Sequence, residues 1–157
     1  DKPVKADAGS SATSIEVGLK FKSDVNGQVL GVRFYKHVNN NGVHTGNLWS
    51  NNGQLLASAT FTSETSSGWQ EVRFATPVSI TANTIYIISY HANNGHFSKD
   101  ENYFQNVEID NPPLHVLTNT GANKNGVYKH GSGNLFPTDS FRATNYWVDV
   151  IFQAVPL

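Results

Sequence analysis

Apolar and polar residues alternate along several short stretches of the chain, and a period of two residues indicates a β-strand with one buried face. The clearest stretch is 14–22, in which an apolar residue stands at every odd position from Ile15 to Phe21, while Glu16 and Lys22 lie on the opposite face. Similar patterns predict strands at 30–34, 47–50, 55–61, 69–74, 78–80, 84–91, 114–117, 127–129 and 146–152.

Turn-forming residues separate these stretches. Asn26-Gly27 and Asn52-Gly53 are typical of tight turns because both residues tolerate a positive φ, and Pro77 divides two of the expected strands. No stretch carries the apolar stripe of a helix with its caps. The pattern predicts an all-β fold, a two-sheet antiparallel β-sandwich of roughly eight or nine strands with jelly-roll-like connectivity.

The length of 157 residues suits one domain, which at this size folds without disulfides. We expect a linker and lead-in at 1–13 and a single β-sandwich domain at 14–157. The chain has no cysteine, which excludes disulfides, thiolate catalysis and cysteine-based zinc sites. It also has no methionine and begins with Asp1, so we expect a mature or excised fragment whose export signal has been removed.

Charged residues make up 15% of the chain, and the formal net charge is -1. Lysine and arginine form no basic block, which argues against nucleic acid or an anionic membrane as a partner. No apolar run approaches the roughly 20 residues of a spanning helix, so no membrane insertion is expected. The polar residues are mostly Asn, Ser, Thr and Gly, as in exported bacterial β-domains, and we expect a secreted, extracellular or cell-surface location.

The alternating pattern is interrupted from 92 to 139, where turn residues dominate. Irregular segments of this length are often functional, and binding residues commonly lie on loops above a rigid scaffold. Aromatic rings can stack on the apolar faces of sugars, while amide and carboxylate groups bind sugar hydroxyls. The candidate ligand-binding residues are Asn94, His96, Tyr103, His115, Tyr128, Asp139, Asn145 and Trp147. The alternative for each aromatic residue is packing at an end of the sandwich.

Trp147 is the sharpest of these candidates because it shares a strand face with Asp149, whereas Tyr146 shares the other face with Val148. If the Tyr146 face packs into the core, Trp147 points outward beside a carboxylate and forms a platform for a sugar ring. If instead the sheet is covered, Trp147 is buried and the platform is lost.

Oxygen-rich turns suggest a second kind of site, because calcium prefers carboxylate and amide oxygens. The candidate calcium ligands are Asp100, Glu101 and Asp110. Asn and Asp also favour turns for backbone reasons alone, so a purely structural explanation stays open. The six histidines do not show the spacing of three or four convergent ligands, which argues against a transition-metal site.

The usual signs of catalysis are missing from the sequence. A glycosidase needs two carboxyl groups roughly 5–9.5 Å apart, and apart from Asp149 the acidic residues considered are isolated or lie in turns. No nucleophile elbow, phosphate-binding loop or His-Glu-Xaa-Xaa-His motif is present. We therefore expect a non-catalytic domain.

Short motifs spread from about Ile15 to Phe152 resemble one bacterial family. They are GVRFYK at 31–36, HTGNLW at 44–49, LLA at 55–57, SGWQEV at 67–72, SYHA at 89–92, NGHF at 94–97, NPPLH at 111–115, FPTDSF at 136–141 and NYWVDV at 145–150. In combination they resemble the family called domain of unknown function 4082. The resemblance implies a secreted β-sandwich module beside immunoglobulin-like, cadherin-like or carbohydrate-active domains in large bacterial proteins, and it transfers no chemistry to any residue.

Two functional hypotheses follow from these observations. The first is a carbohydrate-binding accessory module of a larger secreted protein, which binds polysaccharide through loop aromatics and Asn or Asp side chains. The alternative is a structural or adhesive spacer that contacts neighbouring domains of the same chain and has no small ligand. An exposed aromatic groove favours the first hypothesis, and burial of Trp147 favours the second. Both expect a monomer, with structural calcium as the one candidate cofactor.

Overall fold

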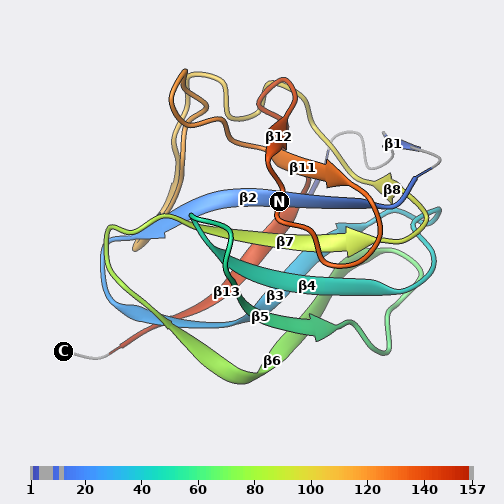
Figure 1. The fold of residues 1–157 in the computed structure, drawn as a ribbon, viewed down its shortest axis with the longest axis horizontal. Helices are drawn as coiled ribbons and strands as arrows, with labels where there is room; N and C mark the ends of the chain where they lie inside the picture. Colours follow the sequence, from blue (N-terminus) through green and yellow to red (C-terminus); the bar gives the residue numbers. More distant parts are fainter. Residues whose placement is uncertain (1, 4–8, 11–12, 156–157) are drawn as a thin grey trace.

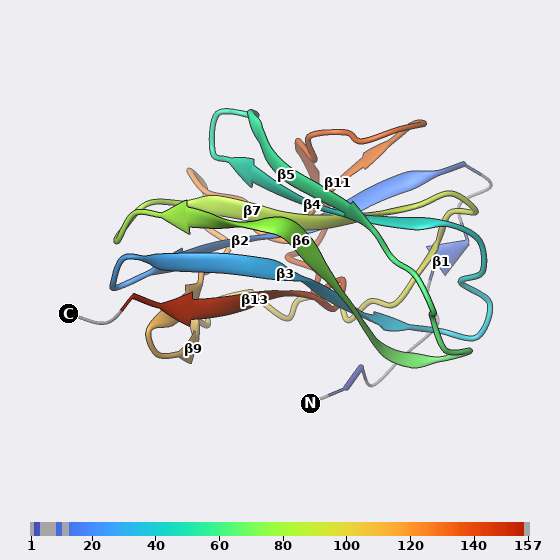
Figure 2. The same ribbon diagram turned by 90° about the horizontal axis from the view of Figure 1, so that it is seen from below.

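The computed structural model describes residues 2–3, 9–10 and 13–155. Every regular element in these ranges is a β-strand, and the longer strands form two layers (Figures 1 and 2). The strands are β1 (Gly9–Ser10), β2 (Ile15–Ser23), β3 (Gly27–Lys36), β4 (His44–Ser50), β5 (Leu55–Thr60), β6 (Gly68–Ile80), β7 (Tyr86–Ala92), β8 (His96–Phe97), β9 (Ile109–Asn111), β10 (Leu114–Val116), β11 (Val127–His130), β12 (Asp139–Ser140) and β13 (Val148–Ala154).

The two layers are sheets of unequal size. The larger sheet has eight strands, with the main order β12-β11-β2-β7-β4-β5; β10 also pairs with β2, and β9 pairs with β10. The smaller sheet has three strands in the order β13-β3-β6, and β1 pairs with β8 in a separate ribbon. All pairs between these strands are antiparallel. Between the two sheets the chain crosses after β2, β3, β5, β6 and β12, and the predicted two-sheet antiparallel β-sandwich is confirmed.

The core lies between the two sheets, on the faces that the alternating pattern predicted. The odd-numbered residues of β2 from Ile15 to Phe21 are at most 5% exposed. Phe34 of β3 stacks on Tyr90 of β7 with ring centroids 4.1 Å apart, and it meets Phe61 edge-on at 4.9 Å. These contacts join the smaller sheet to the larger one.

β6 differs from the prediction, because it runs unbroken through Pro77 where two strands were expected. The ladder between β3 and β6 is interrupted by a bulge, which leaves the residues between Arg73 and Val78 without partners in the regular register. Proline is tolerated at such bulges and in edge strands because it removes no ladder hydrogen bond there.

Four short strands, β1, β8, β9 and β12, were not predicted. Each has two or three residues, which is too short to show an alternating pattern. β1 lies inside the expected lead-in at 1–13 and pairs with β8, so residues 9–10 belong to the fold. Residues 1, 4–8 and 11–12 of that lead-in lie outside the described residues.

The outer face of β2 is covered as well, although the pattern predicted a half-buried strand. Glu16 on this face has no exposed surface. Its carboxylate accepts hydrogen bonds from Asn47 Nδ2 at 2.9 Å and from Ser89 Oγ at 2.6 Å, and His91 Nδ1 lies 3.2 Å away. Asn134 accepts a hydrogen bond from Asn47 at 3.1 Å, so the segment 131–137 is hydrogen-bonded to the same network. A buried carboxylate therefore ties the irregular second half of the chain to the sheet.

Replacing Glu16 by alanine removes the acceptor that these donors share and leaves Ser89 and His91 buried with no carboxylate beside them, while Asn47 keeps its bond to Asn134. We expect Glu16→Ala to lower the free energy of unfolding by about 3–5 kcal/mol, as when a buried charged network loses one member. The measurement is urea-induced unfolding followed by tryptophan fluorescence. Glu71→Ala is the matched control, because Glu71 is exposed on β6 and should change the free energy by less than about 0.5 kcal/mol. Equal losses in the two variants would contradict this account.

Candidate functional site

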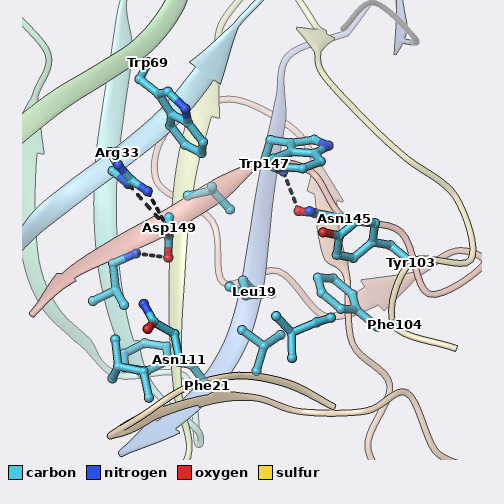
Figure 3. Close-up of a pocket in the computed structure, with 15 residues that line it drawn as sticks. Leu19, Phe21, Arg33, Trp69, Tyr103, Phe104, Asn111, Asn145, Trp147 and Asp149 are labelled. Atoms are coloured by element: carbon cyan, nitrogen blue, oxygen red, sulfur yellow. Dashed lines mark hydrogen bonds and ion pairs between the residues drawn. The ribbon is translucent and has the colours of Figure 1, made fainter. Parts of the chain in front are cut away.

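A pocket of about 340 Å³ lies beside the edge of β13, where the smaller sheet meets the β9–β10 hairpin (Figure 3). β13 pairs with β3 and has no ladder partner on its other side within the described ranges. One side of the pocket is apolar, and β2 and β10 supply Leu19, Phe21, Leu114 and Val116 to it. The volume is near the lower end of the roughly 300–1,000 Å³ found for small-molecule sites.

Aromatic side chains line another side of the pocket. Trp147 lies between Trp69 and Tyr103, with ring centroids 6.4 Å and 5.6 Å from its own. Tyr35 extends this row, since its ring meets Trp69 at 5.6 Å. The rings meet edge to face, with interplanar angles of 86°, 65° and 69° along the row. Aromatic pairs prefer this arrangement, which holds the rings in fixed relative positions.

The backbone at Trp147 has an unusual conformation. Its φ is 55°, in the left-handed region that bulky side chains rarely adopt. Asn145 Oδ1 accepts the backbone N–H of Trp147 at 2.8 Å, and Asp100 Oδ2 accepts the indole N–H at 2.8 Å. Arg142 and Ala143 also have positive φ values, of 50° and 47°. Strained conformations of this kind cluster at functional sites and persist only where neighbouring contacts enforce them.

The structure buries Trp147, which is 7% exposed, so it does not form the exposed platform that the alternating pattern suggested. β13 begins only at Val148, and the left-handed φ takes the indole out of the alternation of the strand. Tyr146 is buried in the core, as that interpretation required. The Trp147 ring therefore forms part of the pocket wall and not an open surface.

The polar side of the pocket is an ion pair between β3 and β13. Arg33 Nη2 and Nε lie 3.1 Å and 3.4 Å from Asp149 Oδ2, and the guanidinium lies over Trp69 with Cζ 4.3 Å from the ring centroid. Asp149 Oδ1 accepts the backbone N–H of Val150 at 2.9 Å. The two side chains are 37% and 40% exposed, and an ion pair this open contributes about 0–1 kcal/mol to stability. The ion pair therefore contributes a polar wall to the pocket more than it stabilises the fold.

Three of the eight predicted ligand-binding residues, Tyr103, Asn145 and Trp147, line this pocket. Asn94 and His96 lie instead at the β7–β8 turn, where Asn94 Oδ1 accepts the His96 N–H at 3.2 Å. That bond is the local backbone interaction that favours Asn in turns.

The other three predicted ligand-binding residues are also outside the pocket lining. Tyr128 packs against the core, with its ring 6.5 Å from that of Tyr146. Asp139 is exposed in β12. His115 belongs to β10, between two residues whose side chains line the pocket, and bonds to carboxylates instead.

Several pocket residues were not identified from the sequence, above all Arg33, Trp69 and Asn111. They belong to segments that were interpreted as structural strands or turns. Arg33 and Asp149 are 116 residues apart and meet only because β3 pairs with β13. The alternating pattern does place Arg33 and Asp149 on outward faces, but it carries no information about which outward faces become neighbours.

The chain matches a protein family over residues 1–148, the family described as Domain of unknown function (DUF4082). The chain belongs to this family. The resemblance inferred from the sequence motifs is confirmed by this match. No curated protein matches the chain significantly. Within the part of the chain that the structure describes, no helix has the length and apolarity needed to cross a membrane.

Two of the three predicted calcium ligands in this DUF4082 domain already accept hydrogen bonds from other side chains of the domain. Asp100 accepts the indole N–H of Trp147. Glu101 accepts bonds from Lys99 Nζ at 3.0 Å and Arg142 Nη1 at 2.9 Å, and these two cations lower the pKa of its carboxyl group. Both acids therefore have a structural explanation.

The third predicted calcium ligand, Asp110, lies in a different cluster. Its Oδ1 is 2.5 Å from His115 Nδ1, and Asp24 Oδ2 is 2.6 Å from the other ring nitrogen. The bonds to Asp24 and Asp110 raise the pKa of His115, as expected for a ring that donates from both nitrogens. Glu108, Asp110 and His115 have ligand atoms within 4.8 Å of one another, and this group includes neither Asp100 nor Glu101. Calcium binding stays a prediction, and the predicted trio does not form one site.

A second polar cluster is buried between the sheets around His44. Its Nδ1 bonds to Glu64 at 2.9 Å, and its Nε2 lies 2.7 Å from Asn40 Oδ1. Lys36 Nζ lies 3.2 Å from the same Glu64 carboxylate. Burial lowers the pKa of His44 in spite of the opposing bond to Glu64. Because His44 has no exposed surface, we assign this cluster a structural role.

The lowered pKa of His44 predicts a loss of stability in acid. In the unfolded chain the His44 imidazole takes up a proton near pH 6.5, and in the folded chain it does so only at lower pH. The contribution of His44 to stability is therefore complete above about pH 6.5 and is lost as the pH falls from there through the lowered native pKa. We expect urea unfolding between pH 7 and pH 5 to show a smaller decline for His44→Gln than for the natural protein. Equal declines would contradict a lowered pKa.

Proposed function

We propose that this domain is a non-catalytic carbohydrate-binding accessory module of a larger secreted bacterial protein, and that it binds a neutral sugar in the pocket beside β13. The observation that carries the proposal is the convergence of aromatic rings, amides and an ion pair on one concave site. A pyranose ring combines apolar faces with a belt of hydroxyl groups, and a site with aromatic and polar walls suits both.

The polar groups of the pocket can serve sugar hydroxyls as donors and acceptors. Asn111 is exposed and carries an amide with two donors and an acceptor. Asn145 uses its Oδ1 for Trp147, so its Nδ2 is the group available to a ligand. Arg33 uses Nε and Nη2 for Asp149, which leaves its Nη1 donors for the pocket. This set of groups supports hydrogen bonding from several directions.

Charge pairing supports a neutral ligand. Arg33 and Asp149 are the charged residues among the lining side chains, and they neutralise each other. An acidic sugar would have to compete with Asp149 for Arg33, and a cationic one would compete with Arg33 for Asp149. A neutral sugar binds without breaking the pair.

The pocket chemistry supports binding more than hydrolysis. A glycosidase requires two carboxyl groups flanking the scissile bond. Asp149 is the acidic residue of the pocket lining, and Arg33 and the Val150 N–H already bond to its carboxylate. The proposal therefore assigns no catalytic residue.

Burial of Trp147 favours the second candidate function, a structural or adhesive spacer that contacts neighbouring domains of the same secreted chain. In that case the pocket would be a by-product of packing Trp147 and Tyr103 at the edge of the smaller sheet. The two candidates differ in a simple observable, which is whether a sugar binds to the isolated domain.

Asn111→Ala provides the test of the binding pocket. Asn111 is exposed at the pocket, so the substitution should leave the fold intact while removing ligand hydrogen bonds worth about 1 kcal/mol. We expect this variant to bind the best soluble oligosaccharide about fivefold more weakly than the natural domain does. The measurement is tryptophan fluorescence titrated with a panel of neutral oligosaccharides.

Asn51→Ala is the matched control for this experiment. Asn51 is an exposed amide in the β4–β5 turn and is absent from the pocket lining, so its replacement should not change the affinity. A flat fluorescence response across the panel, repeated by calorimetry, would favour the spacer. Equal weakening by both substitutions would place the binding site elsewhere.

A further inference from the structure

We propose that the pocket binds the terminal residue of a polysaccharide chain and does not bind an internal stretch. This inference rests on the proposed carbohydrate binding and concerns which part of the glycan is recognised. It follows from the angles between the aromatic rings, from the small volume of the pocket, and from the burial of the residues at one end.

The aromatic row cannot act as a flat binding surface. A chain that lies across a protein, or a crystalline polysaccharide, needs rings that present their faces in a common plane. Here neighbouring rings are inclined by 86° between Tyr35 and Trp69 and by 65° between Trp69 and Trp147. One sugar residue can stack on one ring, but successive residues of a straight chain cannot stack on successive rings.

One end of the pocket is closed by buried side chains. Phe104 is 2% exposed, Trp147 is 7% exposed and Asn145 is 9% exposed, and Figure 3 shows them close together with Tyr103. A glycan that continued past this end would have to displace the Trp147 indole. Its bond to Asp100 and its left-handed backbone both oppose that movement.

The other end of the pocket is open to solvent. Arg33 and Asp149 keep 37% and 40% of their side-chain surface exposed, and Asn111 is also exposed. Figure 3 shows these three residues away from Phe104 and Tyr103. A chain can therefore enter with its terminal residue toward Trp147 and leave past Asn111 and the ion pair. The volume of about 340 Å³ suits a short terminal segment.

The number of protein molecules bound per glycan chain tests this inference. The probes are neutral cello-, xylo-, malto- and manno-oligosaccharides from disaccharide to hexasaccharide, together with soluble polysaccharides of the same linkages. We expect isothermal titration calorimetry to give one protein per chain for every length of the series that binds, with affinity that changes less than about twofold beyond the trisaccharide. Partial hydrolysis of the polysaccharide, which raises the number of chain ends at constant mass, should raise the binding capacity in proportion.

The possible outcomes separate this inference from the proposed function. Several proteins per long chain, or a capacity that follows mass and not chain ends, would overturn the terminal-residue inference and leave carbohydrate binding standing. No binding to any probe would overturn both. One protein per chain with about fivefold weaker binding in Asn111→Ala would support terminal recognition by this pocket. One protein per chain with unchanged affinity in that variant would overturn the inference by placing the bound end elsewhere.

Discussion

Phe34 of β3 stacks almost parallel on Tyr90 of β7, and this contact between the two sheets is the one on which the remaining geometry depends. Phe34 and Tyr90 have no exposed surface, and the apolar faces of both sheets close around them. Hydrophobic burial of such faces drives the sheets together without specifying a direction. The aromatic contact and the β3–β13 ladder specify how the smaller sheet lies over the larger one, with β13 packed across β7 and β2.

The pocket is a consequence of the unequal sizes of the sheets. Three strands cannot cover a sheet of eight, so the inner face of the larger sheet continues beyond β13 toward β10. The segment around Tyr103 lies over part of this surface, and β10, which extends the larger sheet beside β2, contributes to the apolar side of the hollow that is left. The left-handed backbone at Trp147 places a large aromatic ring at this hollow. Strain at the pocket is tolerated because Asn145 and Asp100 hold both N–H groups of that residue.

Two carboxylates each bind several polar groups inside the fold. Glu16 gathers donors from two neighbouring strands, and Glu64 holds both His44 and Lys36. Buried polar groups of this kind are tolerated when they are hydrogen-bonded or paired. The charged groups at the pocket are also paired, because Arg33 and Asp149 neutralise each other. The site therefore offers directional hydrogen bonds without a net charge, which is the basis for proposing a neutral ligand.

The sequence by itself determined the fold class and most of the longer strands, because alternation along a strand is a local property of consecutive residues. It also indicated Tyr103, Asn145 and Trp147 as binding candidates, through their residue types and their place in or beside the irregular segment. The partners of Trp147 were decided only by the tertiary structure. Trp69 reaches it because β6 and β13 both pair with β3, and the same pairing brings together Arg33 and Asp149, which are 116 residues apart. Local patterns distinguish an inward face from an outward one, but the sheet order and register decide which outward residues share a pocket.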